Sequence, residues 1–285
     1  MYNHPLLTDI PLPLQFDPEL YAWLGDSFSK FAKRDFHEAS QPFRLRISNL
    51  GKDTRQLWLE SQYQRKQADF KFINKMFTGT VQELVYLYYL YLSGVPVQDS
   101  GEVELEIGGI TIQGSWDILY DGKEMWDVKT ASDYAYKNKF IDFASLSTDD
   151  PFGYIYQMVG YVEGERKKGN DVIPGGWVVF NKSNGEYKLV HWPKDEELYQ
   201  RIKNRFYRDV EYKIKVIKGE LPPPPCPGAV PETFYQKPTG NMKMNDACRW
   251  CSHPEKCHPT KRVVFEPSRV SKAKNPPIVG YIDEC

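Results

Sequence analysis

The first 225 residues of this 285-residue chain contain no cysteine, because all five cysteines lie in the last sixty residues. Disulfides of a secreted domain are usually spread through the fold, so this distribution favours a metal or cluster site near the C-terminus over a disulfide framework. The chain also lacks an excess of charge of either sign, with a formal net charge of −1 at pH 7. A nucleic-acid-binding surface would therefore be a local basic face and not a field around the whole molecule.

Long apolar runs are missing as well. No apolar run reaches the roughly 20 residues of a membrane-spanning helix, and the first residues lack the features of a signal peptide. We therefore expect a cytoplasmic protein without membrane contacts. Hydrophobic residues make up 41% of the chain, which is enough for a sizeable core in one large domain, or in a core with an appendage.

The hydrophobic pattern predicts the order helix, three strands, helix, two strands, helix. This order is typical of an α/β fold with a central mixed β-sheet flanked by helices. We expect an N-terminal helical segment over residues 1–68, a core with a basic helix over 69–220 and a cysteine-rich tail over 221–285. The pattern also predicts helices within 18–36 and 44–67, from about 69 or 80 to 92, over 152–165 and over 198–217, and a polar loop over 130–149.

Two aspartates and a lysine stand out on consecutive predicted strands, with Asp117 on one strand and Asp127 and Lys129 on the next. Residues i and i+2 of a strand share a face, so Asp127 and Lys129 point the same way. Two carboxylates can hold Mg²⁺ while the ion keeps waters for chemistry, with the carbonyl of Val128 as a further ligand. Lys129 would orient or deprotonate the attacking water, and Glu83 could reach the site from the preceding helix.

A structural interpretation of the same residues is also available. Asp-x-Lys occurs often by chance as solvated charge on an exposed strand face, and Thr80-x-x-Glu83 fits a helix capping box. Gln157 and Tyr161, one helical turn apart, could be an ordinary helix edge. The joint order of these features favours the functional interpretation.

The turn between the two strands must satisfy one geometric condition. If Asp121-Gly122 were a two-residue turn, Asp117 and Asp127 would face opposite sides of the sheet, because side chains alternate with period two. We therefore predict an odd-length loop, or a bulge near Asp117, that brings both carboxylates to one face.

Glu83 on a helix, then Asp117, then Asp127-Val128-Lys129, then Gln157-x-x-x-Tyr161 resembles the PD-(D/E)XK nuclease superfamily over about residues 75–192. Within it the pattern is most similar to the RecB-like and lambda-exonuclease-like branch; Asp127 stands where many members carry Glu. The resemblance implies a restriction-endonuclease-like core and hydrolysis of DNA phosphodiester bonds. It implies Mg²⁺ or Mn²⁺ held by Asp117, Asp127 and the Val128 carbonyl, with Glu83 acting directly or through water. Lys129 would position the water, and Gln157 and Tyr161 would help to place the DNA strand or Lys129.

The cysteine region has the spacing of metal ligands. Cys248, Cys251 and Cys257 form a Cys-x-x-Cys-x₅-Cys pattern, and Cys226, after the proline run 222–225, is the natural fourth ligand. His253 and His258 are reserve ligands, and Cys285 is taken as a bystander. Four thiolates suit Zn²⁺ or an iron–sulfur cluster.

The tail resembles that of RecB-like and CRISPR-adaptation nucleases that carry a [4Fe–4S] cluster. Those families usually place a fourth cysteine before the nuclease core, and residues 48–55 contain none, so zinc stays open. With either metal, we expect a structural site that holds the tail against the core.

The expected function is a Mg²⁺-dependent deoxyribonuclease, an exonuclease of DNA recombination, repair or replication, acting on single-stranded DNA or duplex ends. Basic residues within 198–217 and 243–274 suit a phosphate backbone, and Trp250, Tyr134 and Tyr136 suit stacking on unpaired bases. Solvated charge and core packing are the alternatives for these residues. The alternative functions are a non-catalytic nucleic-acid-binding protein and a structure-selective endonuclease. Replication or recombination proteins are candidate partners, and the sequence leaves the oligomeric state open.

Overall fold

The chain divides into two compact units, one of residues 1–51 and 67–211 and the other of residues 52–66 and 212–285. The computed structural model describes residues 43–63, 70–225, 228–234, 237–245, 248, 251, 253–257, 261–272, 274, 276 and 278–284. The predicted helix within 18–36 and the residues Cys226, Trp250, His258 and Cys285 lie outside these ranges. The expected three-segment boundaries stay predictions, because compactness alone does not test which parts fold independently.

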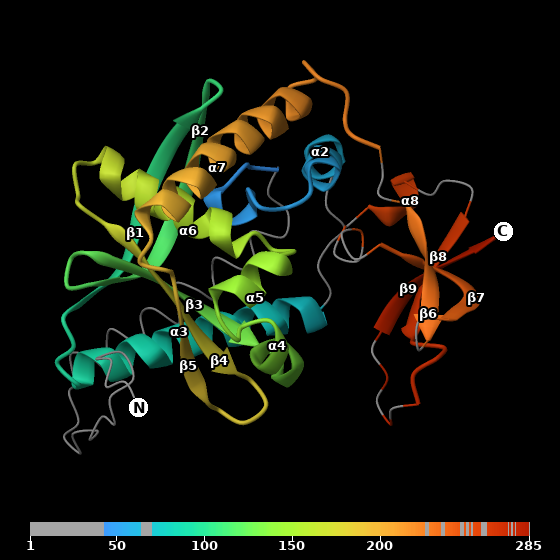
Figure 1. The fold of residues 1–285 in the computed structure, drawn as a ribbon, viewed down its shortest axis with the longest axis horizontal. Coiled ribbons are helices and arrows are strands. Elements are labelled where there is room, and N and C mark those ends of the chain that lie inside the picture. The colour runs from blue at the N-terminus through green and yellow to red at the C-terminus, as the bar shows by residue number, and fades with distance from the viewer. Residues whose placement is uncertain are drawn as a thin grey trace. The chain divides into compact units, whose positions relative to one another are not determined.

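The first unit is built on a mixed sheet in which the described strands have the order β1-β2-β3-β4-β5 (Figure 1). The first three strands form an antiparallel meander, β3 and β4 are parallel, and β4 and β5 form a hairpin. The strands are β1 (Val97–Ile107), β2 (Ile110–Tyr120), β3 (Glu124–Ala131), β4 (Ile173–Asn181) and β5 (Tyr187–His191). The predicted α/β class with a central mixed sheet is thus confirmed.

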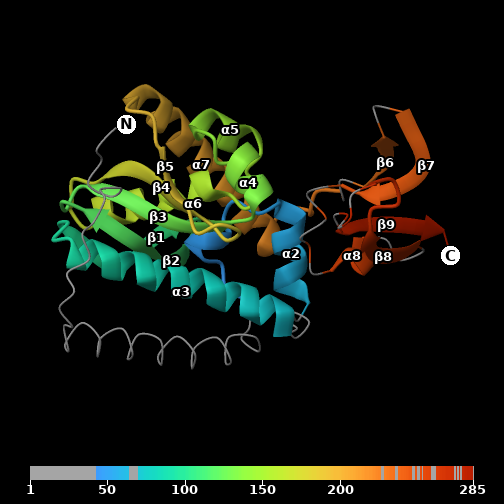
Figure 2. The ribbon, with the colours of Figure 1, turned by 90° about the horizontal axis from the view of Figure 1, so that it is seen from below.

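Helices cover both faces of this sheet (Figure 2). On one face, α3 (Phe70–Leu92) buries Tyr86, Leu87 and Leu90. These side chains pack in one cluster with Ile118 and Trp126 from β2 and β3. The apolar surface of α3 therefore packs against one face of the sheet.

The opposite face carries α6 (Tyr154–Lys167), which lies unusually close to its neighbours. A Cβ atom on Gly160 would stand 2.6 Å from the Ile47 side chain, and one on Gly164 would stand 2.5 Å from Val103. The 3-10 turn η2 (Ile47–Asn49) supplies that isoleucine. Glycine at these two positions lets the helix backbone approach the sheet.

The start of α6 differs by two residues from the prediction, because the helix begins at Tyr154 and not at Phe152. The Asp150 carboxylate caps the helix, since the backbone N–H groups of Tyr154 and Ile155 donate to it at 2.8 and 2.9 Å. Gly153 precedes the helix with φ of +72°. A left-handed residue at the first cap position delays the helix.

The crossover from β3 to β4 corrects a second prediction. Residues 130–149 were expected to form a loop, and they contain α4 (Asp133–Asn138) and α5 (Phe143–Thr148). Each of these short helices has a side-chain cap, from Ser132 to the N–H of Ala135 and from Asp142 to the N–H of Ser145. Such caps satisfy backbone donors that one or two helical turns leave unpaired.

The long helix α7 (Glu196–Ile217) agrees with the prediction and ends before Gly219, whose φ is +78°. Phe206, Val210 and Ile214 are buried along one stripe. Several basic groups on its other faces are paired with carboxylates: Lys203 with Glu163, and Arg205 and Arg208 with Asp209. This pairing reduces the positive charge that the helix could offer to a phosphate backbone.

The second unit contains a separate antiparallel sheet that the sequence did not predict. Its described strands have the order β6-β7-β9-β8, with β6 (Ala229–Phe234), β7 (Lys237–Met244), β8 (Lys261–Pro267) and β9 (Ile278–Glu284). The unit also contains the predicted helix within 44–67, as α2 (Thr54–Gln62), and the short α8 (Pro254–Cys257).

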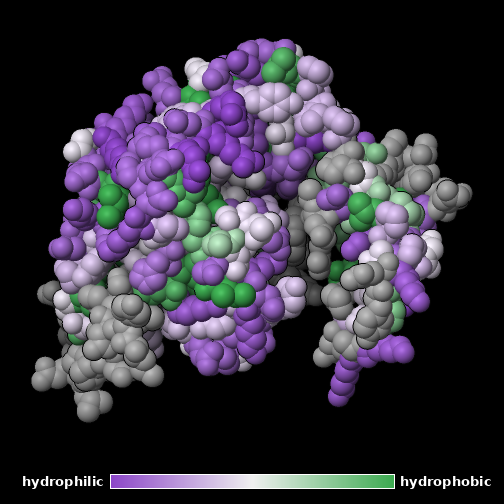
Figure 3. Space-filling model, viewed as in Figure 1, coloured by the Kyte–Doolittle hydropathy of each residue, from purple (hydrophilic) through white to green (hydrophobic). Residues whose placement is uncertain are grey.

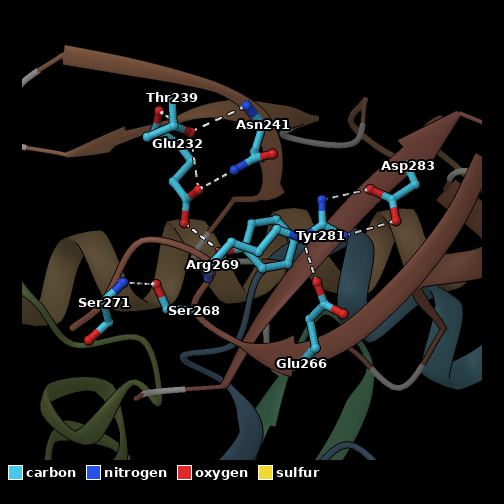
Figure 4. Close-up of polar contacts among 9 residues, drawn as sticks. All are labelled: Glu232, Thr239, Asn241, Glu266, Ser268, Arg269, Ser271, Tyr281 and Asp283. Carbon is cyan, nitrogen blue, oxygen red and sulfur yellow. Dashed lines mark hydrogen bonds and ion pairs between the residues drawn. The ribbon is translucent and has the colours of Figure 1, made fainter. Parts of the chain in front are cut away.

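A polar network holds this sheet together (Figure 4). The Tyr281 hydroxyl donates to Glu232 at 2.6 Å and accepts the backbone N–H of Arg269 at 2.8 Å. The Arg269 guanidinium stacks 4.2 Å from the centroid of the Tyr281 ring and pairs with Glu266 and Asp283.

None of the described helices in either unit is long and apolar enough to cross a membrane.

Candidate active site

The turn between β2 and β3 has three residues, Asp121–Lys123. The strand pairs run from Tyr120 opposite Glu124 to Ile118 opposite Trp126. Asp121 and Gly122 take φ of +50° and +65°, which is how a three-residue loop reverses the chain. The next position of this register sets Asp117 opposite Asp127, and directly opposed residues share a face. The predicted odd-length loop is confirmed.

Beyond Ile118 and Trp126 the two strands separate, and we call this opening the β2/β3 fork. The backbone N–H of Val128, which continues the edge of β3, donates to Asp117 Oδ2 at 2.7 Å. A strand residue directs its N–H and its C=O to the same edge, so the Val128 carbonyl also faces the fork. The Asp117 side chain and the Val128 carbonyl are thereby brought to one place.

Asp127 and Lys129 form a buried ion pair at the fork. Asp127 is 1% exposed, and its Oδ2 lies 2.5 Å from Lys129 Nζ. Its Oδ1 is buried, and the described residues provide no hydrogen-bond donor to it. Burial alone would lower the pKa of Lys129, but attraction by Asp127 and Asp117 outweighs burial and raises that pKa above its ordinary value.

The pKa of Asp117 is also shifted, but here burial and repulsion outweigh the attraction of Lys129. Burial of its carboxylate, followed by repulsion from Glu83 and Asp127, raises its pKa well above the ordinary value, against the lowering effect of Lys129 and the Val128 N–H. Glu83 is therefore close enough for its charge to act on Asp117. The capping-box interpretation of Glu83 is wrong, since Thr80 lies inside α3 and not at its start.

Gln157 and Tyr161 face the same environment from α6. Gln157 Nε2 donates to the Tyr161 hydroxyl at 2.7 Å, and both residues are buried. Burial and the charge of Asp127 raise the pKa of Tyr161, which shows that its hydroxyl lies within electrostatic reach of the fork. The structure therefore assembles Glu83, Asp117, Asp127, Lys129, Gln157 and Tyr161 around one site.

One residue of the site was missed from the sequence. The Tyr154 ring lies beneath the Lys129 ammonium, with Nζ 5.0 Å from the ring centroid. Burial raises the Tyr154 pKa to about 12, so the hydroxyl stays protonated at neutral pH. Tyr154 precedes Gln157 by three residues and Tyr161 by seven, and this helical spacing was the signal that could have found it.

The donor set can be compared with the needs of a hard divalent cation. No three Asp, Glu, His or Cys side chains of the described residues are arranged to hold a metal ion. Mg²⁺ needs fewer protein ligands, since it is usually bound through one or two carboxylates and keeps several waters. Lys129 balances one of the three carboxylates, and the unsatisfied Asp127 Oδ1 and the raised pKa of Asp117 both indicate negative charge beyond what Lys129 balances. The residues present therefore fit Mg²⁺ or Mn²⁺.

The described cysteines lie in the second unit. Cys248 is 7% exposed and packs in a small apolar cluster with Met244 and Ile282. The N–H of Cys251 donates to the Cys248 carbonyl at 3.0 Å, and the N–H of His253 donates to Cys251 Sγ at 3.4 Å. Backbone N–H groups directed at cysteine sulfur stabilise thiolates and metal-bound sulfur.

Helix α2 meets this cysteine segment through a side chain that was not predicted. Arg55 Nε donates to Cys257 Sγ at 3.2 Å, and Arg55 Nη1 donates to the Pro224 carbonyl at 2.9 Å. Tyr63 of the same unit lies with its ring centroid 5.8 Å from that of His253. Arg55 thus supplies a hydrogen-bond donor to the sulfur of Cys257. Because Cys226 lies outside the described residues, the four-cysteine site stays a prediction.

The aromatic residues suggested for base stacking differ in their access to solvent. Tyr134 is 69% exposed on α4. Tyr136 has Lys188 Nζ 4.1 Å from its ring centroid, so one face of that ring is covered by the ammonium.

No protein-family model and no curated protein matches this chain. Among solved structures, the crystal structure of SSO0001 is similar over 82% of this chain and 96% of its own, with a TM-score of 0.44 and 16% identity. A protein from Eubacterium rectale described as a putative exonuclease is similar over 74% of this chain and 90% of its own, with a TM-score of 0.40 and 10% identity. At TM-scores below 0.5 these likenesses carry no functional argument, so function rests on the geometry of the site.

Proposed function

We propose that this chain is a metal-dependent deoxyribonuclease that hydrolyses DNA phosphodiester bonds at the β2/β3 fork. The observation that carries the proposal is the buried Asp127–Lys129 pair beside Asp117, with one carboxylate oxygen that no described donor satisfies. Structural ion pairs are normally fully hydrogen-bonded. Here Lys129 is one cation among three carboxylates, and the unsatisfied Asp127 Oδ1 beside Asp117 favours binding of a second cation. We further propose an exonuclease acting on single-stranded DNA or duplex ends.

In this proposal Asp117, Asp127 and the Val128 carbonyl hold Mg²⁺ or Mn²⁺, and Glu83 acts through a water. The ion, when bound, stabilises charge on the phosphate and lowers the pKa of a bound water. Lys129 is held protonated in the metal-free site, so it serves as a donor that positions the water and the phosphate. The Tyr154 ring fixes the Lys129 chain from below, and Gln157 fixes the Tyr161 hydroxyl on the DNA side.

The cysteine segment would hold a [4Fe–4S] cluster or Zn²⁺ through Cys226, Cys248, Cys251 and Cys257. The turns at Cys248–Cys251 and the donors to Cys251 and Cys257 support a thiolate site. Its role would be structural, holding α2 to the chain around Pro224. Visible absorption of the freshly purified protein distinguishes the two metals, because a cluster is brown and zinc is colourless. The cellular setting that we propose is cytoplasmic DNA recombination, repair or replication, with proteins of those processes as partners.

The test is cleavage of end-labelled linear DNA and of circular DNA with Mg²⁺, with Asp127→Ala and Lys129→Ala beside the wild type. Asp121→Ala is the matched control, since Asp121 is an exposed aspartate of the adjoining turn. We expect the two site variants to lose cleavage and the control to keep it. Products released from ends alone indicate an exonuclease, and cut circles indicate an endonuclease. Cleavage that persists in both site variants, or DNA binding without any cleavage by the wild type, would overturn the proposal.

A further inference from the structure

Asp117 occupies an irregular point of the long β1–β2 hairpin. The pairing of the two strands is complete except at one position, where Ser100 stands opposite Asp117 and does not pair with it. On its other side Asp117 adjoins the β2/β3 fork, where the pairing with β3 has ended. Among these strands, which the structure describes throughout, Asp117 is therefore the one residue of β2 that pairs with neither neighbour.

Ser100 also has an unusual backbone. Its φ is +34°, in the left-handed region, which a residue other than glycine enters only at a cost in free energy. Among the described residues only Asp121, in the β2–β3 turn, shares this feature without being glycine. The Ser100 side chain is exposed, so its packing does not explain the conformation. A left-handed residue inside a strand re-aims the neighbouring side chains, as it does at β-bulges.

The alternation of side chains along β2 reverses at Asp117. Residues two apart on a regular strand share a face of the sheet, but Trp116 and Ile118 do not. The Trp116 indole N–H donates to Glu165 of α6 at 2.8 Å. Ile118 packs with Leu87 of α3, on the opposite face. Helix α7 covers α6 in turn and presents mainly hydrophilic residues outward (Figure 3), so a side chain that turns to α6 enters a core.

The same reversal occurs in β1, at Ser100. Val103 lies on the α6 side, since a Cβ on Gly164 would stand 2.5 Å from its side chain. Val97 lies an even number of positions from Val103 and should share its face, yet it packs against the apolar cluster beneath α3. The two strands therefore turn over together, and the left-handed Ser100 stands at the turning point of β1.

The Asp117 carboxylate lies where the two faces exchange. It accepts the N–H of Val128, and the N–H groups of a strand lie in the plane of its sheet. Side chains of a regular strand stand roughly perpendicular to that plane. A side chain that points along the plane to the next strand fits a residue at which the alternation reverses. The reversal thus directs Asp117 into the β2/β3 fork, beside Asp127 and Lys129.

We propose that Ser100 is a positioning residue for Asp117. Its left-handed backbone takes up in β1 the reversal that β2 makes at Asp117, so the hairpin stays paired on both sides and the carboxylate is held at the fork. In an extended conformation Ser100 would pair with Asp117 and restore the ordinary alternation, which directs the carboxylate out of the plane. The inference adds a residue outside the candidate active site, and it rests on the proposed function only in taking Asp117 as a ligand of the ion.

The test changes the backbone preference of position 100 and leaves the site residues in place. Ser100→Val disfavours the left-handed conformation because valine is branched at Cβ, whereas Ser100→Gly and Ser100→Asn favour it. Ser100→Ala is a milder form of the first change. Gln98→Val is the matched control, since Gln98 is also exposed on β1 but pairs regularly with Leu119.

The first measurement is hydrogen exchange of the Val128 amide, followed by NMR in the metal-free protein, because this amide donates to Asp117. Ser100→Val should speed the exchange about tenfold relative to that of the Leu105 amide, which is the scale of the preference against the left-handed region. Leu105 lies in the regularly paired part of β1, so the ratio removes any loss of global stability. Ser100→Gly, Ser100→Asn and Gln98→Val should exchange like the wild type. Ser100→Ala should show a smaller change in the direction of valine, and it carries the test if valine prevents folding.

The second measurement is the binding of Mn²⁺, determined from the electron paramagnetic resonance signal of the free ion. Ser100→Val should bind Mn²⁺ roughly tenfold more weakly than the wild type, and Ser100→Gly should bind it equally well. A merely structural role of Ser100 would lower the unfolding temperature and leave both the exchange ratio and the Mn²⁺ affinity unchanged.

The inference is overturned if the Val128 amide of Ser100→Val and Ser100→Ala exchanges as in the wild type, or if Ser100→Gly speeds the exchange as much as Ser100→Val. The outcomes separate it from the nuclease proposal. Val128 exchange that depends on Ser100, in a protein that neither binds Mn²⁺ nor cleaves DNA, refutes the nuclease alone. Cleavage of DNA by the wild type, with Val128 exchange that is insensitive to Ser100, refutes the positioning role alone.

Discussion

Replacing Asp117 by Asn tests the electrostatics of the site in two opposite directions. The raised pKa of Asp117 shows that its charge is disfavoured by burial and by repulsion from Glu83 and Asp127. Asn removes the charge and can still accept the Val128 N–H through its amide oxygen. We therefore expect Asp117→Asn to stabilise the metal-free protein by roughly 0.5–2 kcal/mol, as other changes that relieve a destabilised site do.

With Mg²⁺ present, the order of stability of the wild type and Asp117→Asn should reverse. At a concentration one hundred times its dissociation constant, a ligand of the folded state stabilises by about 2.7 kcal/mol. For a folded unit of this size, that corresponds to a rise in the unfolding temperature of roughly 5–10 °C. Asp117→Asn loses one of two carboxylate ligands, so we expect its Mg²⁺-dependent rise to be small or absent.

Thermal unfolding followed by near-ultraviolet circular dichroism, with and without Mg²⁺, measures both effects. Asp121→Asn is the control, because Asp121 is exposed and Asn tolerates its positive φ. An Mg²⁺-dependent rise in Asp117→Asn equal to that of the wild type would show that Asp117 does not hold the ion. A metal-free Asp117→Asn that unfolds below the wild type would refute the electrostatic argument.

Three further predictions follow from the contacts. Lys129→Met should lower the rate of DNA cleavage by about 10²–10⁴-fold. The variant should keep the Mg²⁺-dependent rise in unfolding temperature, because in the proposal Lys129 positions water and does not bind the ion. Loss of that rise would contradict this role. The Glu165 pKa is raised by burial but lowered more by hydrogen bonds from Lys168, Trp116 and Asn170. Its contribution to the free energy of unfolding is therefore present above the ordinary pKa of about 4.5 and lost as pH falls below it, and Glu165→Gln should flatten acid unfolding curves there. Arg55→Gln removes the donor to Cys257 and should weaken metal retention in the cysteine segment by roughly 10–100-fold in chelator competition, with unchanged affinity as the contrary result.

Much of the core could be predicted because its signals are local. Alternation and turn residues located the strands, and the shared face of Asp127 and Lys129 follows from strand periodicity alone. An odd-length loop, or a bulge near Asp117, was predicted from a requirement of function, and the structure has the odd-length loop. Helices α4 and α5 were missed because one or two turns are too short to show a period, and they depend on single capping side chains.

Contacts between distant residues left no local pattern. Arg55 and Cys257 are 202 positions apart, and nothing in either segment indicates that the guanidinium reaches the sulfur. The second sheet was missed for a related reason. Pro231 and Pro238 lie in its first two strands, and its buried Glu232 is acceptable only because Tyr281 and Asn241 donate to it. Proline and a buried carboxylate both argue against a strand until the partners are known.

The turn between β2 and β3 also limits how this chain can evolve. Side chains alternate between faces with a period of two, so pairing the same residues around a two-residue turn, with Tyr120 opposite Lys123, would bring Trp126, and not Asp127, opposite Asp117. An insertion that only lengthens the turn and keeps Tyr120 opposite Glu124 would leave the pairing intact. Solvent-exposed turns are ordinarily where lengths vary most freely between relatives. Here we expect relatives to vary in turn length only where Tyr120 stays opposite Glu124, so that the exposed turn is constrained by the register of the buried strands behind it.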